Sequence, residues 1–188
     1  ENDSHEKYNS DICLISEYIG TSYLHAAEAF DKHTKKKLNN PKLLENINLA
    51  RGYVEIVKYT IKFCIRNNMK LIIPLKRDKK YSPKLHETEY EFYKSNLEKD
   101  EFDYFKKSFL EKEIDNFSSY RAVLNSKVAV GIGSTLLKDK LGTGGKILSC
   151  NLTEENMFNF PINGICTLNN CSYTEFEKLL LEIYSISS

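Results

Sequence analysis

A glycine followed by two hydroxyl residues, Gly133-Ser134-Thr135, stands where a buried apolar stretch gives way to a short helical one. The first amides of a helix have no partner within the helix, and the helix dipole favours negative charge beside them. Glycine lets the backbone turn sharply at such a place. The turn therefore predicts a site for a phosphate-bearing small molecule. The alternative is a tight strand-to-helix turn without a ligand, in which Ser134 only caps the helix.

The sequence around this turn differs from two common phosphate-binding loops. Gly131-Ile132-Gly133 lacks the third glycine of the dinucleotide-binding fingerprint, and no Gly-Lys-Ser/Thr follows as in a P-loop. The surroundings nevertheless favour a ligand, because an apolar strand is predicted over residues 127–132 and a second over residues 146–150, after glycines 142, 144 and 145. In a doubly wound α/β sheet, ligands bind beyond the carboxyl ends of such strands.

Charged residues are expected at the same edge of the sheet. Lys76 and Arg77 follow the strand predicted over residues 70–75, and their cations suit a pyrophosphate or a nucleotide phosphate. Glu17 ends the strand predicted over residues 11–18, where an acid can bond a ribose or sugar hydroxyl or act as a base. The alternatives are an exposed charged loop for the two cations and an exposed acid at a strand end for Glu17.

Further polar residues flank the turn. Asp139 lies four residues after Thr135 in the predicted short helix, where it can bond a sugar hydroxyl or remain a solvated helix residue. Ser118 and Ser119 open the preceding helix and point toward the same edge, with an N-cap as the alternative role. We assign no catalytic residue. No His, Cys or acidic cluster has metal-ligand spacing, so we expect neither a metal nor a cofactor.

The apolar pattern gives the order of the elements that position these residues. After the strand at 11–18, an Asn-Pro pair begins a long helix that reaches about Arg66, with apolar residues at spacings of three and four. The strand at 70–75 completes a βαβ unit, which implies a parallel pair with a right-handed crossover. We expect the carboxyl end of this strand to neighbour that of the strand at 127–132.

The rest of the chain completes one domain. Further helices are predicted over residues 23–30, 83–97, 120–125 and 173–184, the last with a capping box of Ser172 and Glu175. Residues 98–117 mix aromatic and charged side chains, and only a short strand near 102–105 is expected there. We therefore predict an α/β domain with a doubly wound, mostly parallel sheet over residues 11–188. Residues 1–10 are polar and are interpreted as an inter-domain linker or an artificial start of the chain.

Composition narrows the functional classes. The 188 residues carry 27 basic and 26 acidic side chains, and this near-neutral balance gives no general reason to expect a nucleic-acid partner. Five scattered cysteines are typical of buried free thiols in a reducing compartment. No signal peptide is visible, and no run of about 18 apolar residues suggests a membrane span. We therefore expect a cytoplasmic location.

The segment from Ser118 to Thr153 resembles the C-terminal donor-binding domain of GT-B glycosyltransferases, chiefly those that make bacterial surface polysaccharide. A strand, a Ser-Thr turn, an acidic residue in the next helix and a glycine-rich stretch follow in the same order. The resemblance implies that Ser134 and Thr135 hold the donor phosphate, and it places Asp139 where the group usually has Glu. The chain departs from the group at Lys138 and Lys140, where small or neutral residues are usual. It also has Lys76-Arg77 where a His-Pro or similar motif often stands.

The resemblance implies a Rossmann-like half of a GT-B fold that binds a nucleotide-sugar donor without a metal, with Lys76 and Arg77 offsetting the charge of the leaving group. It also implies an acceptor-binding domain upstream, outside this chain, and a peripheral association of the full-length protein with the inner face of the membrane. Two alternatives stay open. One is half of an enzyme similar to UDP-sugar 2-epimerases, which share the two-domain fold, and the other is a non-catalytic binding module.

Overall fold

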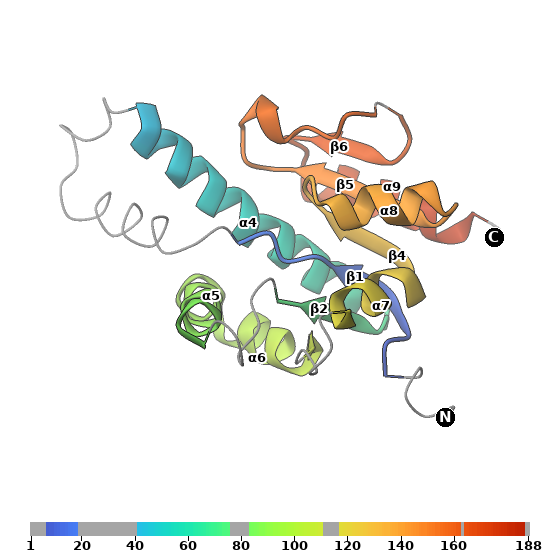
Figure 1. Cartoon of the computed structure of the whole chain (residues 1–188), viewed down its shortest axis with the longest axis horizontal. Coiled ribbons are helices and arrows are strands. Elements are labelled where there is room, and N and C mark those ends of the chain that lie inside the picture. The colour runs from blue at the N-terminus through green and yellow to red at the C-terminus, as the bar shows by residue number, and fades with distance from the viewer. Residues whose placement is uncertain (1–6, 19–40, 76–82, 111–116, 163, 187–188) are drawn as a thin grey trace.

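The computed structural model describes residues 7–18, 41–75, 83–110, 117–162 and 164–186, with the backbone alone for residues 41–47. In these residues six strands form one sheet in the order β3-β2-β1-β4-β5-β6, and every neighbouring pair is parallel (Figure 1). The strands are β1 (Ser10–Leu14), β2 (Leu71–Pro74), β3 (Phe109–Leu110), β4 (Ser126–Gly131), β5 (Lys146–Asn151) and β6 (Thr167–Asn169). This is the Rossmann strand order, so the predicted doubly wound α/β fold is confirmed.

Helices cover both faces of the sheet. They are α4 (Pro41–Arg66), α5 (Pro83–Asn96), α6 (Lys99–Ser108), α7 (Ser118–Asn125), α8 (Thr135–Gly142) and α9 (Tyr173–Ser185), with a 3₁₀ turn η1 (Asn156–Phe158) between β5 and β6. The predicted capping box at the start of α9 is present, since the Ser172 side chain accepts from the Glu175 amide and the Glu175 carboxylate accepts from the Ser172 amide. This reciprocal pairing satisfies amides that the helix itself leaves free.

Side chains that alternate between the two faces of the strands contribute to two separate apolar cores, one on each face of the sheet. Ile12 and Leu14 of β1 pack with α4, α5, α6 and α9, whereas Cys13 packs on the opposite face with α7 and α8. In β4 the same division puts Val128 and Val130 on the first face and Ala129 on the second. Successive side chains of a strand point to opposite faces, so a sheet buried on both sides needs continuous apolar strands. The site lies at the edge where these strands end.

Two predictions about the elements are wrong. Residues 102–105 belong to α6 rather than to a strand, because a capping box of Glu98 and Glu101 starts a helix there. Phe102 and Phe105 then stack on one side of that helix, and the short strand follows as β3. The strand at 70–75 does not neighbour the strand at 127–132, because β1 lies between β2 and β4 and pairs with both.

The predicted helix at 23–30, together with Lys76 and Arg77, lies outside the described residues, and so does most of the expected linker at 1–10. Tyr8 is nevertheless buried in the core beneath α7, and β1 begins at Ser10.

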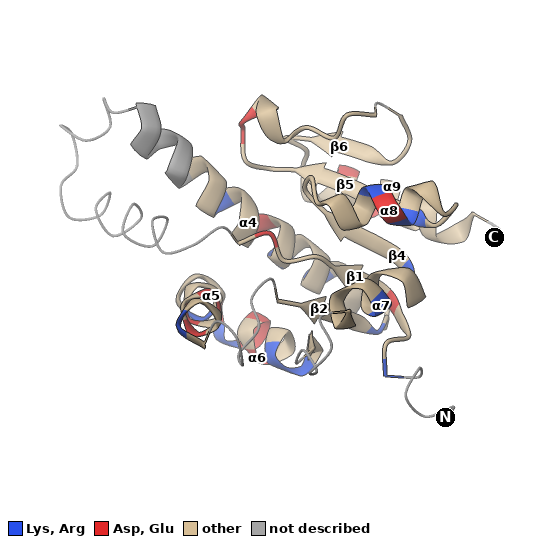
Figure 2. Cartoon of the chain, in the orientation of Figure 1, with Lys and Arg blue, Asp and Glu red and all other residues tan. Residues whose placement is uncertain are grey.

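Charges are mixed over the surface. Figure 2 shows acidic and basic residues close together along α5, α6 and α8. In the described part of the chain, every helix is too short or too polar to cross a bilayer.

Candidate functional site

A pocket of about 590 Å³ opens between β1 and β4, where the order of the strands reverses, at the carboxyl ends of β1, β2 and β4. From β1 the chain proceeds toward β2, whereas from β4 it proceeds toward β5, so this is the topological switch point at which such sheets bind ligands. The walls come from five segments far apart in sequence. The lining residues are Ile15 to Glu17, Pro74 and Leu75, Ser119 and Tyr120, Gly133 to Leu136 with Lys138, and Met157 to Asn159 with Pro161.

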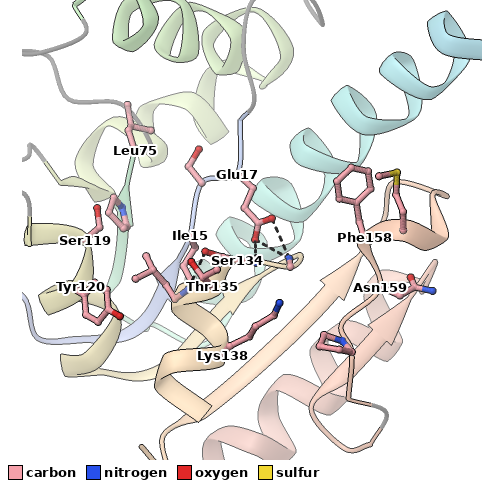
Figure 3. Close-up of a pocket in the computed structure, with 16 residues that line it drawn as sticks. Ile15, Glu17, Leu75, Ser119, Tyr120, Ser134, Thr135, Lys138, Phe158 and Asn159 are labelled. Carbon is pink, nitrogen blue, oxygen red and sulfur yellow. Dashed lines mark hydrogen bonds between the residues drawn. The ribbon is translucent and has the colours of Figure 1, made fainter. Parts of the chain in front are cut away.

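The structure brings Glu17 and the Gly-Ser-Thr turn into direct contact (Figure 3). The Glu17 Oε1 atom accepts from the backbone N–H of Ile132 at 2.8 Å, of Gly133 at 3.0 Å and of Ser134 at 3.0 Å. The Gly133 N–H also lies 3.1 Å from Oε2. A carboxylate of the protein itself therefore occupies the amides just before α8, whereas the sequence predicted a bound phosphate at the first amides of the helix. Glu17 is half-buried, so it is not the freely exposed acid of the alternative reading.

Ser134 and Thr135 hold different positions at the start of α8. Ser134 is the N-cap residue, and its hydroxyl accepts from the Leu136 N–H at 3.3 Å. Thr135 is exposed at the pocket wall. The alternative role foreseen for Ser134, a helix cap, is thus present beside any role in binding.

The two lysines of α8 have different environments: Lys138 lies at the pocket and Lys140 lies in the interior. Lys138 is exposed and lines the pocket. Lys140 is buried, and its ammonium donates to the carbonyls of Val123 at 2.7 Å and Ser126 at 2.6 Å. Burial lowers the pKa of Lys140 to about 8. Of these two lysines, Lys138 is the one that adds positive charge to the pocket wall.

The polar residues at the start of α7 lie partly at the pocket and partly in the interior. Ser119 and Tyr120 line the pocket, and Tyr120 donates a short hydrogen bond to Asp139 of α8, which raises the pKa of Tyr120. Asp139 therefore holds a pocket residue and is not itself part of the wall. Ser118 is fully buried, and its hydroxyl has no hydrogen-bond partner among the described residues. The N-cap of α7 is Phe117, so neither serine takes the alternative role of N-cap.

Sequence reasoning missed the wall opposite α7. Figure 3 shows Phe158 and Asn159 on one side of the pocket, with Ser119 and Tyr120 on the other. An Asn151 side chain anchors this wall, because its amide nitrogen donates to Asn159 Oδ1 at 2.7 Å and to the Glu155 carbonyl at 3.0 Å. The Asn151 Oδ1 accepts from the Thr153 N–H and hydroxyl. The signal available was a cluster of Asn and Thr directly after a strand, which is typical of an ordered loop.

The remaining predicted residues, Lys76 and Arg77, lie outside the described part of the chain, although Leu75 directly before them lines the pocket. Among the described residues, no group of three or more His, Cys, Asp or Glu side chains is arranged to hold a metal ion.

A comparison with protein-family models matches residues 2–175 to a family described as "putative O-antigen biosynthesis protein". The chain belongs to this family. Its name points to the biosynthesis of O-antigen, so the predicted role in surface polysaccharide biosynthesis is confirmed at that level. The assignment to GT-B glycosyltransferases and the nucleotide-sugar ligand stay predictions. No curated protein and no solved structure matches the chain.

Proposed function

We propose that this domain binds the nucleotide-sugar donor of a glycosyltransferase that acts in O-antigen biosynthesis. The observation that carries the proposal is the pocket at the switch point of a parallel sheet, in a member of an O-antigen biosynthesis family. A volume of about 590 Å³ lies within the range of small-molecule sites. In sheets of this type, nucleotides bind at this place.

The chemistry of the wall supports a ligand that carries both hydroxyls and phosphate. The hydroxyl group of Ser119 and the amide of Asn159 can exchange hydrogen bonds with sugar or ribose hydroxyls, and the hydroxyl group of Thr135 can donate to a phosphate oxygen. Lys138 supplies a cation, and Lys76 with Arg77 is proposed to add two more just beyond Leu75. Glycosyl transfer leaves a nucleotide phosphate as the leaving group, and fixed cations stabilise that developing charge.

The first experiment is a binding screen of UDP-, GDP-, CMP- and dTDP-sugars by thermal shift, followed by calorimetry. A ligand that binds only the folded state raises the unfolding temperature by mass action. Free sugars and nucleosides are screened beside them. We expect one class of nucleotide-sugar to bind and the free sugar to give no shift. A screen in which none of these ligands stabilises the domain would contradict the proposal.

The matched variants are Thr135→Val and Thr143→Val, which remove exposed hydroxyls at the two ends of α8. Only Thr135 lines the pocket, whereas the Thr143 hydroxyl donates to the Lys140 carbonyl. A lost hydrogen bond to a charged phosphate weakens binding by about 1.5–3 kcal/mol, so we expect a roughly 10-fold to 100-fold loss for Thr135→Val. Equal affinities of the two variants would leave Thr135 without a role in binding.

Turnover by the full-length protein separates the alternatives. Transfer of the sugar to an acceptor identifies a transferase, whereas inversion at one sugar carbon without transfer identifies an epimerase. Binding without either reaction identifies a non-catalytic module.

A further inference from the structure

The backbone amides of Ile132, Gly133 and Ser134 form a cradle for one anion, and Glu17 fills it. All three N–H groups lie between 2.8 and 3.0 Å from a single carboxylate oxygen. Because each amide has one proton to donate, a phosphate oxygen cannot use these donors while Glu17 holds them. Two anions in one cradle would also repel each other.

The contact is built into neighbouring strands. β1 pairs with β4 in parallel register, with Leu14 opposite Val130, and the Ile15 N–H extends the pairing to the Val130 carbonyl at 2.8 Å. This register brings Glu17 beside the start of the turn. A Cβ atom at Gly131 would lie 3.1 Å from Glu17 Oε1, so the absence of a side chain there lets the carboxylate approach. The strand register thus brings Glu17 to the cradle, Gly131 leaves room for its carboxylate, and the carboxylate fills the cradle.

We propose that Glu17 excludes phosphate from the amide cradle and thereby determines where the ligand's phosphate binds in the pocket. The inference rests on the proposed function, which it deepens. With the cradle closed to anions, the phosphate is directed to the exposed cation Lys138 and to Thr135 on the pocket wall. Hydroxyl groups of the ligand are not subject to this exclusion, because a carboxylate accepts hydrogen bonds from them.

The test compares Glu17→Ala with Asp139→Ala, using inorganic pyrophosphate as the probe. Both changes remove one carboxylate near the pocket, but only Glu17 occupies the cradle. We expect Glu17→Ala to bind pyrophosphate at least tenfold more tightly than the wild type, and Asp139→Ala to change that affinity less than threefold. Equal gains in both variants would mean a general charge effect and would overturn the proposal, as would no gain or a loss in Glu17→Ala.

A second measurement covers the case in which Glu17→Ala is poorly folded. Pyrophosphate is titrated into the ¹⁵N-labelled wild-type domain, and the amide signals of Ile132, Gly133 and Lys138 are followed. We expect a shift at Lys138 and unchanged signals at Ile132 and Gly133. Large shifts at the two cradle amides of the wild type would overturn the proposal.

The proposed function and the exclusion by Glu17 can fail independently of each other. If wild-type protein binds no nucleotide-sugar, the proposed function fails, yet a gain of pyrophosphate binding in Glu17→Ala still supports the exclusion. If nucleotide-sugars bind and Glu17→Ala gains nothing for pyrophosphate, only the exclusion fails.

Discussion

Gly131 and Gly133 lie two residues apart at the edge of the pocket, yet the structure gives them different tasks. A Cβ atom at Gly131 would stand 3.1 Å from Glu17 Oε1 and 3.2 Å from Leu137 Cδ1. At Gly133 the nearest atom would be the Phe158 carbonyl oxygen, at 3.4 Å, which is ordinary contact. Close approach of the Glu17 and Leu137 side chains, rather than an unusual backbone angle, is thus what favours a glycine at position 131.

We predict that Gly131→Ala destabilises the domain by about 1–3 kcal/mol, because the added methyl group pushes on Glu17 and on the buried Leu137. Gly133→Ala should stay within about 0.5 kcal/mol of the wild type, since its methyl group meets no close neighbour. Urea unfolding of the three proteins measures both effects. If Gly131→Ala is as stable as the wild type, the prediction is contradicted, and Glu17 can move away from the amides without a loss of stability.

At the scale of elements, Lys140 joins α8 to the end of α7. Its ammonium donates to the Val123 carbonyl of α7 and to the carbonyl of Ser126, where β4 begins. A helix leaves its last carbonyls without partners, and a buried cation satisfies two acceptors at this junction. Gly145 makes room, since a Cβ atom there would lie 2.6 Å from Lys140 Cγ. This side chain therefore joins α7 and α8 on the buried side, and the Tyr120–Asp139 hydrogen bond joins them on the exposed side.

The lysine gives a pH dependence that can be measured. Burial lowers the pKa of Lys140 to about 8 from its ordinary 10.5. Between these values the unfolded state binds more protons at this group than the folded state does, so its contribution to stability rises with pH. We predict that the free energy of unfolding of the wild type increases relative to Lys140→Met between pH 8 and pH 10.

The matched control for that series is Lys138→Met, which changes an exposed lysine of the same helix. The change measured for Lys138→Met is subtracted from that for Lys140→Met, so that the effect of the buried lysine remains. A difference that stays constant with pH after this subtraction would contradict the assignment of the titration to Lys140.

At the scale of the whole molecule, two cysteines far apart in the sequence meet at the far side of the sheet. The Sγ atoms of Cys150 in β5 and Cys171 before α9 lie 3.6 Å apart. Their hydrogen bond lowers the pKa of Cys171 and raises that of Cys150. The cysteines are free thiols, and three of them are buried as predicted, whereas Cys166 and Cys171 are partly exposed. The sequence did not indicate this pair, because its spacing matches no common motif.

We predict that diamide converts this pair to a disulfide, with the two thiol hydrogens passing to the diamide. Two of the five thiols should then be lost to a thiol reagent after unfolding. A crosslink over a loop of this length stabilises by about 3 kcal/mol, and a reductant should reverse the gain. Cys171→Ser should abolish both effects. Persistence of five reactive thiols after treatment would contradict the prediction.

Local patterns in the sequence were sufficient to predict most elements. The long helix ending at Arg66, the capping box at Ser172 and the strands around the turn follow from periodicity and capping residues alone. These signals depend on residues within a few positions of one another. They failed at residues 102–105, where a capping box and two stacked phenylalanines favour a helix over a strand.

Contacts between distant residues were decided only by the tertiary structure. The sequence by itself determined that a Gly-Ser-Thr turn would lead from a buried strand into a helix, and that Glu17 would lie at the same edge of the sheet, although β1 ends at Leu14 rather than at Glu17. It did not determine that these partners, more than a hundred positions apart, would bond to each other. The order of the strands places β1 between β2 and β4, and the register then sets which side chains meet. Short-range propensity carries no information about that order, because strand order is selected by the packing of the whole sheet.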